Sequence, residues 1–352
     1  MKVAIDARTM QEHPRGGIGR GLANLVPLMQ EHVDITLLQD SGRERVASPL
    51  PSVALRTPLP AASMTWLQLP AVAWLRGFDG VFHCPFYGLP HRLPVPGVAT
   101  LHDLTYEHFP RMFSRRQTLS FRVQSRHAAK VAAVLLAPSQ FVKDDIVSTY
   151  DLDPARVLVA PNGRDPVFRP DADVAAARDR LGIRRPYVVA LGGAGRRNLP
   201  LAIEAWARAT ADHDLVVVGP ERPADRAGLL VAGPVDDETW AGLLAGAQAF
   251  LYPTSYEGYG MPGIEALAAG APVVATRTSA LPEVLGNGAV WAESLAVEDL
   301  AAALAGLLSD DLARQAKRKA GLQHADSAPG WPESAAVHLE AYRLAGSQDR
   351  GG

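Results

Sequence analysis

Residues 252–284 read YPTSYEGYGMPGIEALAAGAPVVATRTSALPEV. An apolar strand ends at Tyr252, a glycine-rich loop follows, and we expect a helix over about 262–269. Proline suits the first helical turn because its missing N–H has no partner there, and Gly270 is a natural stop. Glycines let backbone amides approach a ligand closely, and a helix N-terminus favours negative charge such as a diphosphate. The glycines concerned are Gly258, Gly260 and Gly263.

Two carboxylates accompany this loop. Glu257 stands just before its glycines and Glu265 in the first part of the helix, eight positions later. An ionised carboxylate accepts two hydrogen bonds, which suits the vicinal hydroxyls of a ribose or a hexose. Taken singly, Glu265 is also explained as a helix-dipole carboxylate and Glu257 as a solvated loop residue. Their joint occurrence in a strand, glycine loop and helix favours sugar binding.

Short apolar runs alternate with helical patterns along the whole chain. Continuous apolar strands separated by helices indicate parallel sheets covered on both faces. The runs form two series, so we predict an α/β protein with two Rossmann-like, doubly wound domains. The expected strands are 3–5, 35–38, 80–83, 98–101 and 134–137, then 187–191, 215–218, 229–232, 249–252 and 273–275.

The domains are expected at 1–170 and 171–330, with the seam in 169–185, where proline and charge gather. Residues 331–352 should form a C-terminal helix that crosses back to the first domain, followed by a tail; a helix capping the second domain is the alternative. In open α/β sheets, ligands bind beyond the carboxyl ends of the strands. Two facing sheets then place a ligand in the cleft between them.

The amino-acid composition limits the functional classes and the cellular compartment that we expect. The 352 residues are 47% hydrophobic and 20% charged with net charge −2, which is globular and does not favour nucleic acid. Cys84 is the sole cysteine, which suits a reducing compartment. We find no signal-peptide pattern and no apolar run long enough to span a membrane. We therefore expect a cytoplasmic protein, with room for peripheral contact at the inner face of the membrane.

The segment EGYGMPGIE resembles the E-x7-E motif of retaining glycosyltransferases of family 4, which have the GT-B fold. The resemblance extends through ALAAGAPVVATRTSALPEV and over nearly the whole chain. It implies that Glu265 binds the ribose of the donor nucleotide and that Glu257 contacts the transferred sugar. It also implies that backbone amides in this loop hold sugar and diphosphate; the residues are Tyr259, Gly260, Met261, Pro262 and Gly263.

A second motif, LGGAGRRNL over residues 191–199, resembles the family's loop in which an Arg and a Lys grip the donor diphosphate. Arg196 and Arg197 occupy those places, with Gly193 leading into them. The family's usual Lys is an Arg here, and the loop is one residue shorter. Arg offers phosphate a bidentate fork where Lys offers a point charge, so the role is retained. Two exposed arginines in a turn are the weaker interpretation.

The glycines of RGGIGRG, residues 15–21, come too late after the first strand for a dinucleotide-binding G-x-G-x-x-G. The resemblance assigns Gly16 and Gly17 to the cleft, near donor phosphate or acceptor. In the motif PNGR, residues 161–164, it places Asn162 beside the cleft, although the motif is also explained as a simple turn.

His102 and Asp103 end the expected strand 98–101 on the cleft side. A lone histidine is more often structural, but its place at a strand end favours function. In similar enzymes the matching His lies beside the transferred sugar, and Asp103 faces the acceptor. His83 and Cys84 also follow a strand; without metal-ligand spacing elsewhere, we interpret both as pocket lining or core.

The family implies a retaining, metal-independent hexosyl transfer from a nucleoside diphosphate sugar to a glycan, lipid-linked or small-molecule hydroxyl, without a cofactor. The first-half motifs resemble mannosyl-type members slightly more, which favours GDP-mannose over UDP- and dTDP-sugars. Arg196, Arg197 and the loop amides would stabilise the leaving phosphate. A sugar-nucleotide epimerase of the same fold and a non-catalytic nucleotide-sugar-binding partner are the alternatives. A nicotinamide dehydrogenase is disfavoured by the glycine spacing.

Overall fold

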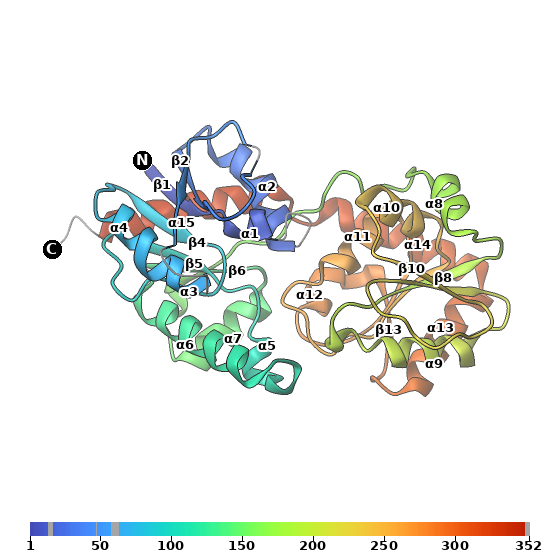
Figure 1. Ribbon diagram of the computed structural model, residues 1–352. Coiled ribbons are helices and arrows are strands. Elements are labelled where there is room, and N and C mark those ends of the chain that lie inside the picture. The colour runs from blue at the N-terminus through green and yellow to red at the C-terminus, as the bar shows by residue number, and fades with distance from the viewer. Residues whose placement is uncertain (13–16, 47, 58–62, 349–352) are drawn as a thin grey trace. The chain divides into compact units, whose positions relative to one another are not determined.

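The computed structural model describes residues 1–12, 17–46, 48–57 and 63–348, so Gly16 lies outside the described residues. The chain divides into two compact units. The first consists of Met1–Gly163 with Pro329–Gly352, and the second of Arg164–Ala328. Each unit is a parallel sheet with helices on both faces (Figure 1). The predicted class, two Rossmann-like doubly wound domains, is confirmed.

The first unit is built on a sheet of order β3-β2-β1-β4-β5-β6-β7, in which every neighbouring pair is parallel. The order reverses between β1 and β4, which is the doubly wound arrangement that opens a crevice at the carboxyl ends of the strands. The strands are β1 (Lys2–Asp6), β2 (Asp34–Asp40), β3 (Ser52–Leu55), β4 (Val81–Cys84), β5 (Gly97–Thr100), β6 (Val134–Ala137) and β7 (Val157–Val159).

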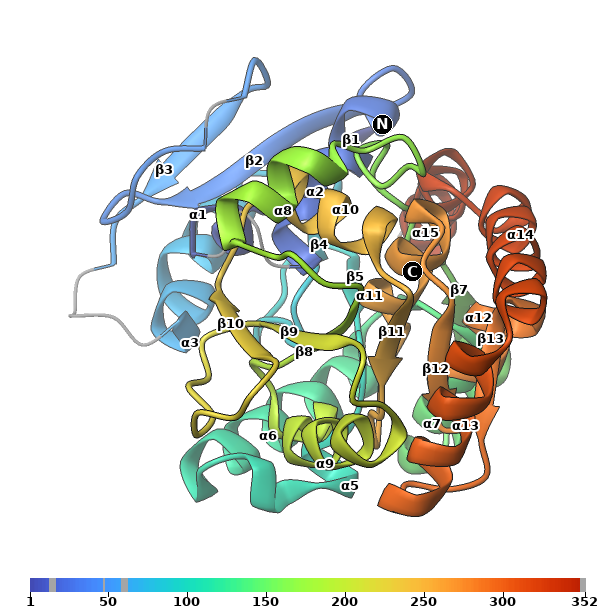
Figure 2. The same ribbon diagram turned by 90° about the vertical axis from the view of Figure 1, so that its right-hand side faces the viewer.

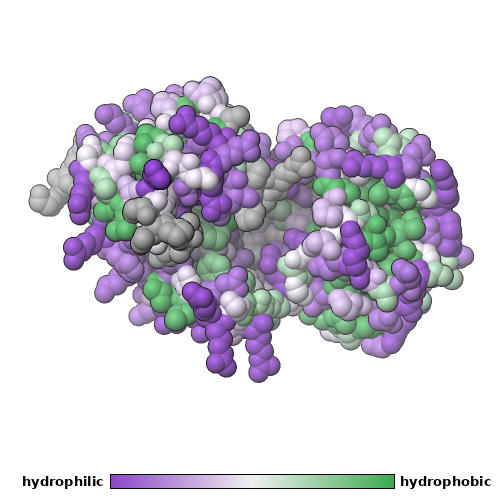
Figure 3. Space-filling model, in the orientation of Figure 1, coloured by the Kyte–Doolittle hydropathy of each residue, from purple (hydrophilic) through white to green (hydrophobic). Residues whose placement is uncertain are grey.

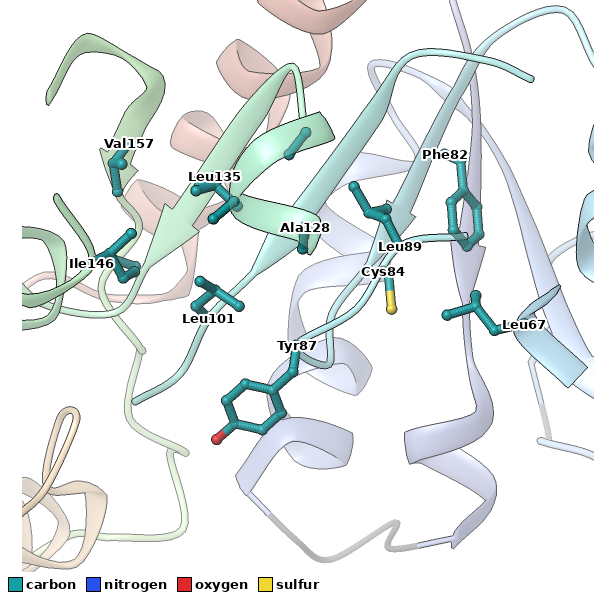
Figure 4. Packing of buried hydrophobic residues seen from close by; sticks show 14 of the residues in the cluster. Leu67, Phe82, Cys84, Tyr87, Leu89, Leu101, Ala128, Leu135, Ile146 and Val157 are labelled. Carbon is teal, nitrogen blue, oxygen red and sulfur yellow. The ribbon is translucent and has the colours of Figure 1, made fainter. Parts of the chain in front are cut away.

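Helices cover both faces of this sheet. On one face Tyr87, Leu101 and Leu135 belong to an apolar cluster that also contains Cys84 (Figure 4). On the other face, residues of α2 and α15 pack against the strands. The helices of the unit are α1 (Arg8–Glu12), α2 (Gly17–Met29), α3 (Ser63–Trp66), α4 (Val72–Leu75), α5 (Thr105–His108), α6 (Arg115–Val131), α7 (Gln140–Tyr150) and α15 (Trp331–Gln348).

The C-terminal helix α15 belongs to the first unit, although 165 residues of the second unit separate it from β7 in the sequence. It runs beside α2 (Figure 1) and buries Tyr342 fully under the sheet. Gly163, at the end of the first segment, allows the close approach, because a Cβ there would stand 2.4 Å from the backbone nitrogen of Trp331.

The second unit repeats the plan with a sheet of order β10-β9-β8-β11-β12-β13, again parallel throughout. The strands are β8 (Tyr187–Leu191), β9 (Asp214–Val218), β10 (Leu229–Gly233), β11 (Ala249–Tyr252), β12 (Val273–Thr276) and β13 (Ala289–Ala292). The helices are α8 (Val174–Leu181), α9 (Leu199–Ala209), α10 (Asp237–Gly246), α11 (Met261–Ala269), α12 (Leu281–Leu285), α13 (Val297–Ser309) and α14 (Asp311–Ser327).

Figure 2 shows how these helices are distributed over the sheet. Helices α9 and α13 lie side by side and form one apolar layer with β8, β9 and β11. Helices α8, α10 and α11 cover the opposite face, where α10 contacts both α8 and α11. Helix α10 is therefore packed on two sides.

The sequence pattern did not predict three strands, each of which lies at the edge of its sheet. β3, β7 and β13 are three or four residues long and are the last strands of their sheets. Their sequences, SVAL, VLV and AVWA, are largely apolar but short, and a short apolar run cannot be assigned to a strand or a helix from its pattern alone. The stretch 169–185, expected as the seam, contains α8, and the units divide earlier, after Gly163.

Hydrophilic side chains predominate on the face of both units seen in Figure 3, although apolar side chains gather on the second unit. Within the described part of the chain, no helix has the length and apolar character needed to cross a membrane. Helix α6 carries four arginines and one lysine, and its outer face exposes Leu119 and Val123 between arginines.

The packing of α10 against α8 in the second unit can be tested by substitution. A Cβ at Gly242 would stand 2.5 Å from the Asp173 carbonyl oxygen and 2.9 Å from Ala177 Cβ, so Gly242→Ala should lower the free energy of unfolding by about 1–3 kcal/mol. Gly306, also inside a helix, would meet nothing within 4 Å, and Gly306→Ala should raise it by up to about 1 kcal/mol. Urea unfolding of both variants measures the difference; equal effects would contradict the close α8–α10 contact.

Candidate active site

Helix α11 begins as the glycine and proline pattern predicts. Gly260 has φ +93° and caps the helix, Pro262 occupies the first turn, and Gly270, with φ +84°, ends it. Two of these glycines also serve packing. A Cβ on Gly260 would stand 2.5 Å from Leu281 Cδ2, and one on Gly263 would stand 2.8 Å from Leu285 Cδ2. The short helix α12 thus lies directly on the loop.

Some backbone N–H groups at the start of α11 are hydrogen-bonded within the protein and others are not. The N–H of Gly263 donates to the Gly260 carbonyl at 2.9 Å, and Pro262 has none. Among the residues that the structure describes, the N–H groups of Tyr259, Gly260 and Met261 have no acceptor. A helix N-terminus with unpaired donors is an anion-binding arrangement. Burial raises the pKa of Tyr259 to about 12, so its hydroxyl stays neutral.

Glu257 is buried and held by several groups at the end of β11. One carboxylate oxygen, Oε1, accepts from the Tyr252 hydroxyl at 2.7 Å, and Oε2 accepts from Arg196 Nη2 at 3.3 Å. Arg197 Nε stands 3.9 Å from Oε1. The Glu257 N–H donates to Ser279 Oγ at 2.8 Å. Burial, followed by the nearby Glu257 charge, raises the pKa of Tyr252 and keeps it a donor.

The two arginines lie on a single 3₁₀ turn, Gly195–Arg197, after β8. The Arg196 carbonyl accepts from the backbone N–H of Ser255 at 2.8 Å and from the Thr254 hydroxyl at 3.2 Å. Asn198, in the left-handed region with φ +50°, donates from Nδ2 to the Pro253 carbonyl at 2.8 Å. These bonds attach the arginine turn to the chain just before Glu257.

The chain before the turn carries further contacts. Arg197 Nη1 donates to the Gly192 carbonyl at 2.6 Å. Gly193, with φ +94°, donates its N–H to Glu221 Oε1, a carboxylate from the loop after β9. Two guanidinium groups thus share this edge of the second unit with two carboxylates, the buried Glu257 and Glu221.

Glu265 projects from α11 toward α10. It is 2% exposed, and its Oε2 accepts from Trp240 Nε1 at 3.2 Å. A buried carboxylate requires hydrogen-bond partners to remain charged, and the indole N–H is one of them. The two glutamates of the motif are thus both buried, each positioned by an aromatic side chain that the motif does not contain.

In the first unit, His102 follows β5 and lines a small cavity of about 30 Å³. Its Nε2 pairs with the Pro85 carbonyl at 2.8 Å, so Nε2 carries the proton and Nδ1 is the lone-pair nitrogen. Burial lowers the pKa of His102, which is therefore neutral near pH 7. Gly17 and Asn162 line the same cavity, so the structure brings together three of the predicted residues of this unit.

Asp103 does not line that cavity. Its Oδ1 accepts from the backbone N–H of Thr105 at 3.0 Å, which closes the turn into α5. Cys84 lies in the apolar cluster of Figure 4, and burial raises its thiol pKa to about 12, so the thiol is unreactive.

Sequence reasoning missed four residues that shape these sites. Tyr252 and Ser279 hold Glu257, Trp240 holds Glu265, and His338 of α15 lines the cavity beside His102. Trp240 is 25 positions from its partner, and His338 comes from the far end of the chain. Tyr252 alone had a local signal, because a tyrosine at the end of a strand next to a motif carboxylate is within its reach.

Comparison with known proteins agrees with the fold and identifies the family. Residues 185–310 match the family described as Glycosyl transferases group 1, and residues 15–168 match Glycosyltransferase Family 4. The chain is 25% identical over 311 residues to O-antigen chain mannosyltransferase B of Escherichia coli, covering 82% of this chain and 81% of that protein. It is 32% identical over 241 residues to a D-inositol 3-phosphate glycosyltransferase of Kribbella flavida, covering 60% and 56%.

Solved structures show the same architecture. WaaG, described as a glycosyltransferase involved in lipopolysaccharide biosynthesis, aligns over 100% of both chains with a TM-score of 0.71 and 17% identity. Anabaena HepE in complex with UDP-glucose aligns over 97% of this chain and 100% of its own, with a TM-score of 0.74 and 16% identity. The fold is the GT-B fold of glycosyltransferases. The chain belongs to glycosyltransferase family 4, the group 1 glycosyltransferases.

The neutral histidines around the cavity predict an acid-sensitive first unit. Burial lowers the pKa of His338 to about 4, whereas an unfolded histidine has a pKa near 6.5. Below about pH 6.5 the unfolded chain therefore binds more protons, and stability falls as pH drops toward 4, by up to about 3 kcal/mol from this group. Denaturant unfolding at pH 7.5, 6 and 5 should show a shallower pH dependence in His338→Phe than in the unchanged protein. Identical slopes would contradict the buried, neutral state of His338.

Proposed function

We propose that this protein is a retaining hexosyltransferase that uses a nucleoside diphosphate sugar as donor and an acceptor hydroxyl as nucleophile. The observation that carries the proposal is the arrangement of Glu257 with Arg196, Arg197 and the amide donors of α11. A carboxylate for sugar hydroxyls thus adjoins two guanidinium groups and a set of amide donors for phosphate.

Each part of the donor has a matching group. Arg196 and Arg197 present guanidinium forks to the diphosphate, and the N–H groups of Tyr259, Gly260 and Met261 add neutral donors. The buried carboxylate of Glu265 would accept the two ribose hydroxyls. Glu257, held by Tyr252, would accept hydroxyls of the transferred hexose.

The reaction breaks the bond between the anomeric carbon and the diphosphate oxygen and forms a bond to the acceptor oxygen. Negative charge then grows on the leaving phosphate, where the two arginines are placed to stabilise it. The acceptor attacks from the face that the leaving group vacates, so the anomeric configuration is retained. Its proton passes to the departing phosphate, and we assign no protein group as base.

We also propose that the transfer needs no metal ion or cofactor. Two guanidinium groups and three amides already supply the positive field that a divalent cation would give a diphosphate. Among the described residues, no three His, Cys, Asp or Glu side chains gather closely enough to bind a metal.

For the donor we propose GDP-mannose first, with UDP- and dTDP-sugars as alternatives. Two relatives are named as mannosyltransferases, the Escherichia coli protein above and an MMP alpha-(1->4)-mannosyltransferase of Mycolicibacterium hassiacum, 29% identical over 254 residues. HepE, in contrast, is described in complex with UDP-glucose. The relatives named above are transferases, and nothing among them favours the epimerase alternative.

The outer face of α6 suits an acceptor carried on an anionic surface, including the inner face of a membrane. Leu119 is 64% exposed and Val123 47%, and both lie between basic residues of one helix. Apolar side chains framed by arginines are typical of helices that rest on anionic lipid. The exposed basic residues are Arg115, Arg116, Arg126 and Lys130.

The two glutamates should fail in different ways. Calorimetry with GDP, UDP, dTDP and ADP first identifies the nucleotide that binds. Glu265→Ala should then weaken the binding of that nucleotide by about 1.5–3 kcal/mol, because charge-assisted hydrogen bonds to the ribose are lost. Glu257→Ala should leave nucleotide affinity nearly unchanged and lower turnover with the intact donor.

Two controls make that comparison sharp. Glu265→Gln keeps a hydrogen-bond acceptor for Trp240 but removes the charge, so it separates an effect on nucleotide binding from an effect on folding. Glu298→Ala removes an exposed glutamate on α13 and serves as the matched control. Unchanged nucleotide affinity in Glu265→Ala would remove the ribose assignment.

The arginines should act on the transition state. Arg196→Ala and Arg197→Ala should each lower kcat roughly 10²–10³-fold, by analogy with loss of one oxyanion donor. Arg197→Lys should recover part of the loss, and EDTA should leave the rate of the unchanged protein as it was. Arg184→Ala, an exposed arginine paired with Asp179, is the matched control.

Steady-state kinetics with and without chelator decide the matter. Near-normal turnover in both alanine variants would reject the phosphate role. Collapse of the rate in EDTA would reject the metal-free mechanism.

A further inference from the structure

The cavity beside His102 is lined by three imidazoles from three different elements. His83 comes from β4, His102 from the chain after β5, and His338 from the C-terminal helix α15. His83 and His338 have ring centroids 5.6 Å apart. His338 is 5% exposed, so a polar atom there needs a partner within the fold.

Hydrogen bonds fix which nitrogen of each ring has a proton. His338 Nδ1 pairs with the Ser334 carbonyl at 2.8 Å, so Nδ1 is the donor and Nε2 bears the lone pair. His102 Nε2 donates to the Pro85 carbonyl, so its lone pair is on Nδ1. In the described part of the chain, neither lone pair has a donor. Two acceptors therefore border one small cavity.

The hydrogen bonds of His83 determine whether the Thr100 hydroxyl can donate its proton into the cavity. Its Nδ1 stands 2.8 Å from the Tyr342 hydroxyl and its Nε2 stands 2.9 Å from Thr100 Oγ1. Neutral imidazole has one proton, so one hydroxyl donates and the other accepts. Tyr342 is fully buried, and its O–H would be unsatisfied unless it donates to Nδ1. His83 Nε2 then donates to Thr100, and the Thr100 proton is available to an acceptor in the cavity that Thr100 lines.

Three residues that line a cavity of about 30 Å³, His102, His338 and Thr100, thus carry two acceptors and one donor without partners of their own in the described part of the chain. One water needs about 10–15 Å³ and makes about three hydrogen bonds when buried. A hydroxyl group of a substrate has one proton and satisfies only one of the two lone pairs. Water has two protons and one oxygen to accept, which matches all three groups.

We propose that this cavity binds a water molecule that donates to His102 Nδ1 and to His338 Nε2 and accepts from the Thr100 hydroxyl. His338 is thereby a positioning residue for His102, because the water and the Pro85 carbonyl hold the two nitrogens of that ring from opposite sides. The catalytic consequence rests on the proposed function, in which His102 lies beside the transferred sugar. The water site itself does not.

The first test uses the full chain without substrate. With histidine labelled by ¹⁵N, long-range proton–nitrogen correlation spectra report the tautomer of His102 and the hydrogen bond at Nδ1. His338→Phe, which keeps a ring but removes the lone pair, and Thr100→Val should both move the His102 Nδ1 resonance toward that of an imidazole nitrogen without a hydrogen bond. His338→Gln keeps an acceptor and should leave it close to its original position. His127→Phe, a histidine of α6, is the control.

The second test is kinetic. His338→Phe should lower kcat about threefold to tenfold with KM nearly unchanged, as expected for loss of one water-mediated bond to a positioned ring, and His338→Gln should recover most of it. An unmoved His102 resonance in both His338→Phe and Thr100→Val, or one that moves only when donor is added, would overturn the water site. A moved resonance with unchanged kcat would overturn the positioning role. Absence of any transfer by the unchanged protein would reject the proposed function and leave the spectra to decide the water site.

Discussion

The buried carboxylate of Glu257 is the constraint on which the second unit's site depends. A charge removed from water must be compensated by polar partners, and here they come from two separate stretches of chain. Tyr252 belongs to the end of β11 and Arg196 to the turn after β8. A third stretch, the segment before α12, holds the Glu257 backbone, because Ser279 Oγ accepts from the Glu257 N–H. The backbone repeats the connection, because the Ala280 N–H donates to the Glu257 carbonyl at 3.3 Å. Moving the end of β11 or the arginine turn would leave the carboxylate short of a partner.

This constraint explains why the arginine turn is built so firmly. Its carbonyl at Arg196 is bound by both Ser255 and Thr254, and Asn198 adopts a left-handed conformation to reach Pro253. Such attachments cost conformational freedom, and they bring two positive side chains beside one negative one without relying on exposed ion pairs, which stabilise little. The two guanidinium groups are then preorganised, so that little reorganisation is needed when a leaving group becomes negative.

The sequence predicted the features that depend on local chemistry. Proline and glycine mark the ends of α11 because their backbone preferences act within a few residues, and central strands reveal themselves because both faces are buried. The edge strands β3, β7 and β13 were missed because their apolar runs are short, and periodicity cannot assign a short run to a strand or a helix. Trp240 and His338 were missed for another reason. Each meets its site only through packing of elements distant in the sequence, so no spacing rule indicates it.

The structure gives the glycines of the motif a second role. Sequence reasoning assigned them to ligand approach, whereas Gly260 and Gly263 also admit Leu281 and Leu285 of α12. Because α12 follows directly on Ser279 and Ala280, the packing that needs glycine also holds the segment that binds the Glu257 backbone. The glycine spacing therefore satisfies two requirements at once: open amides at the helix start and a close helix behind it. A larger residue at Gly263 would disturb the backbone contacts of Glu257 through α12 even though the Gly263 amide is already bound within its own helix.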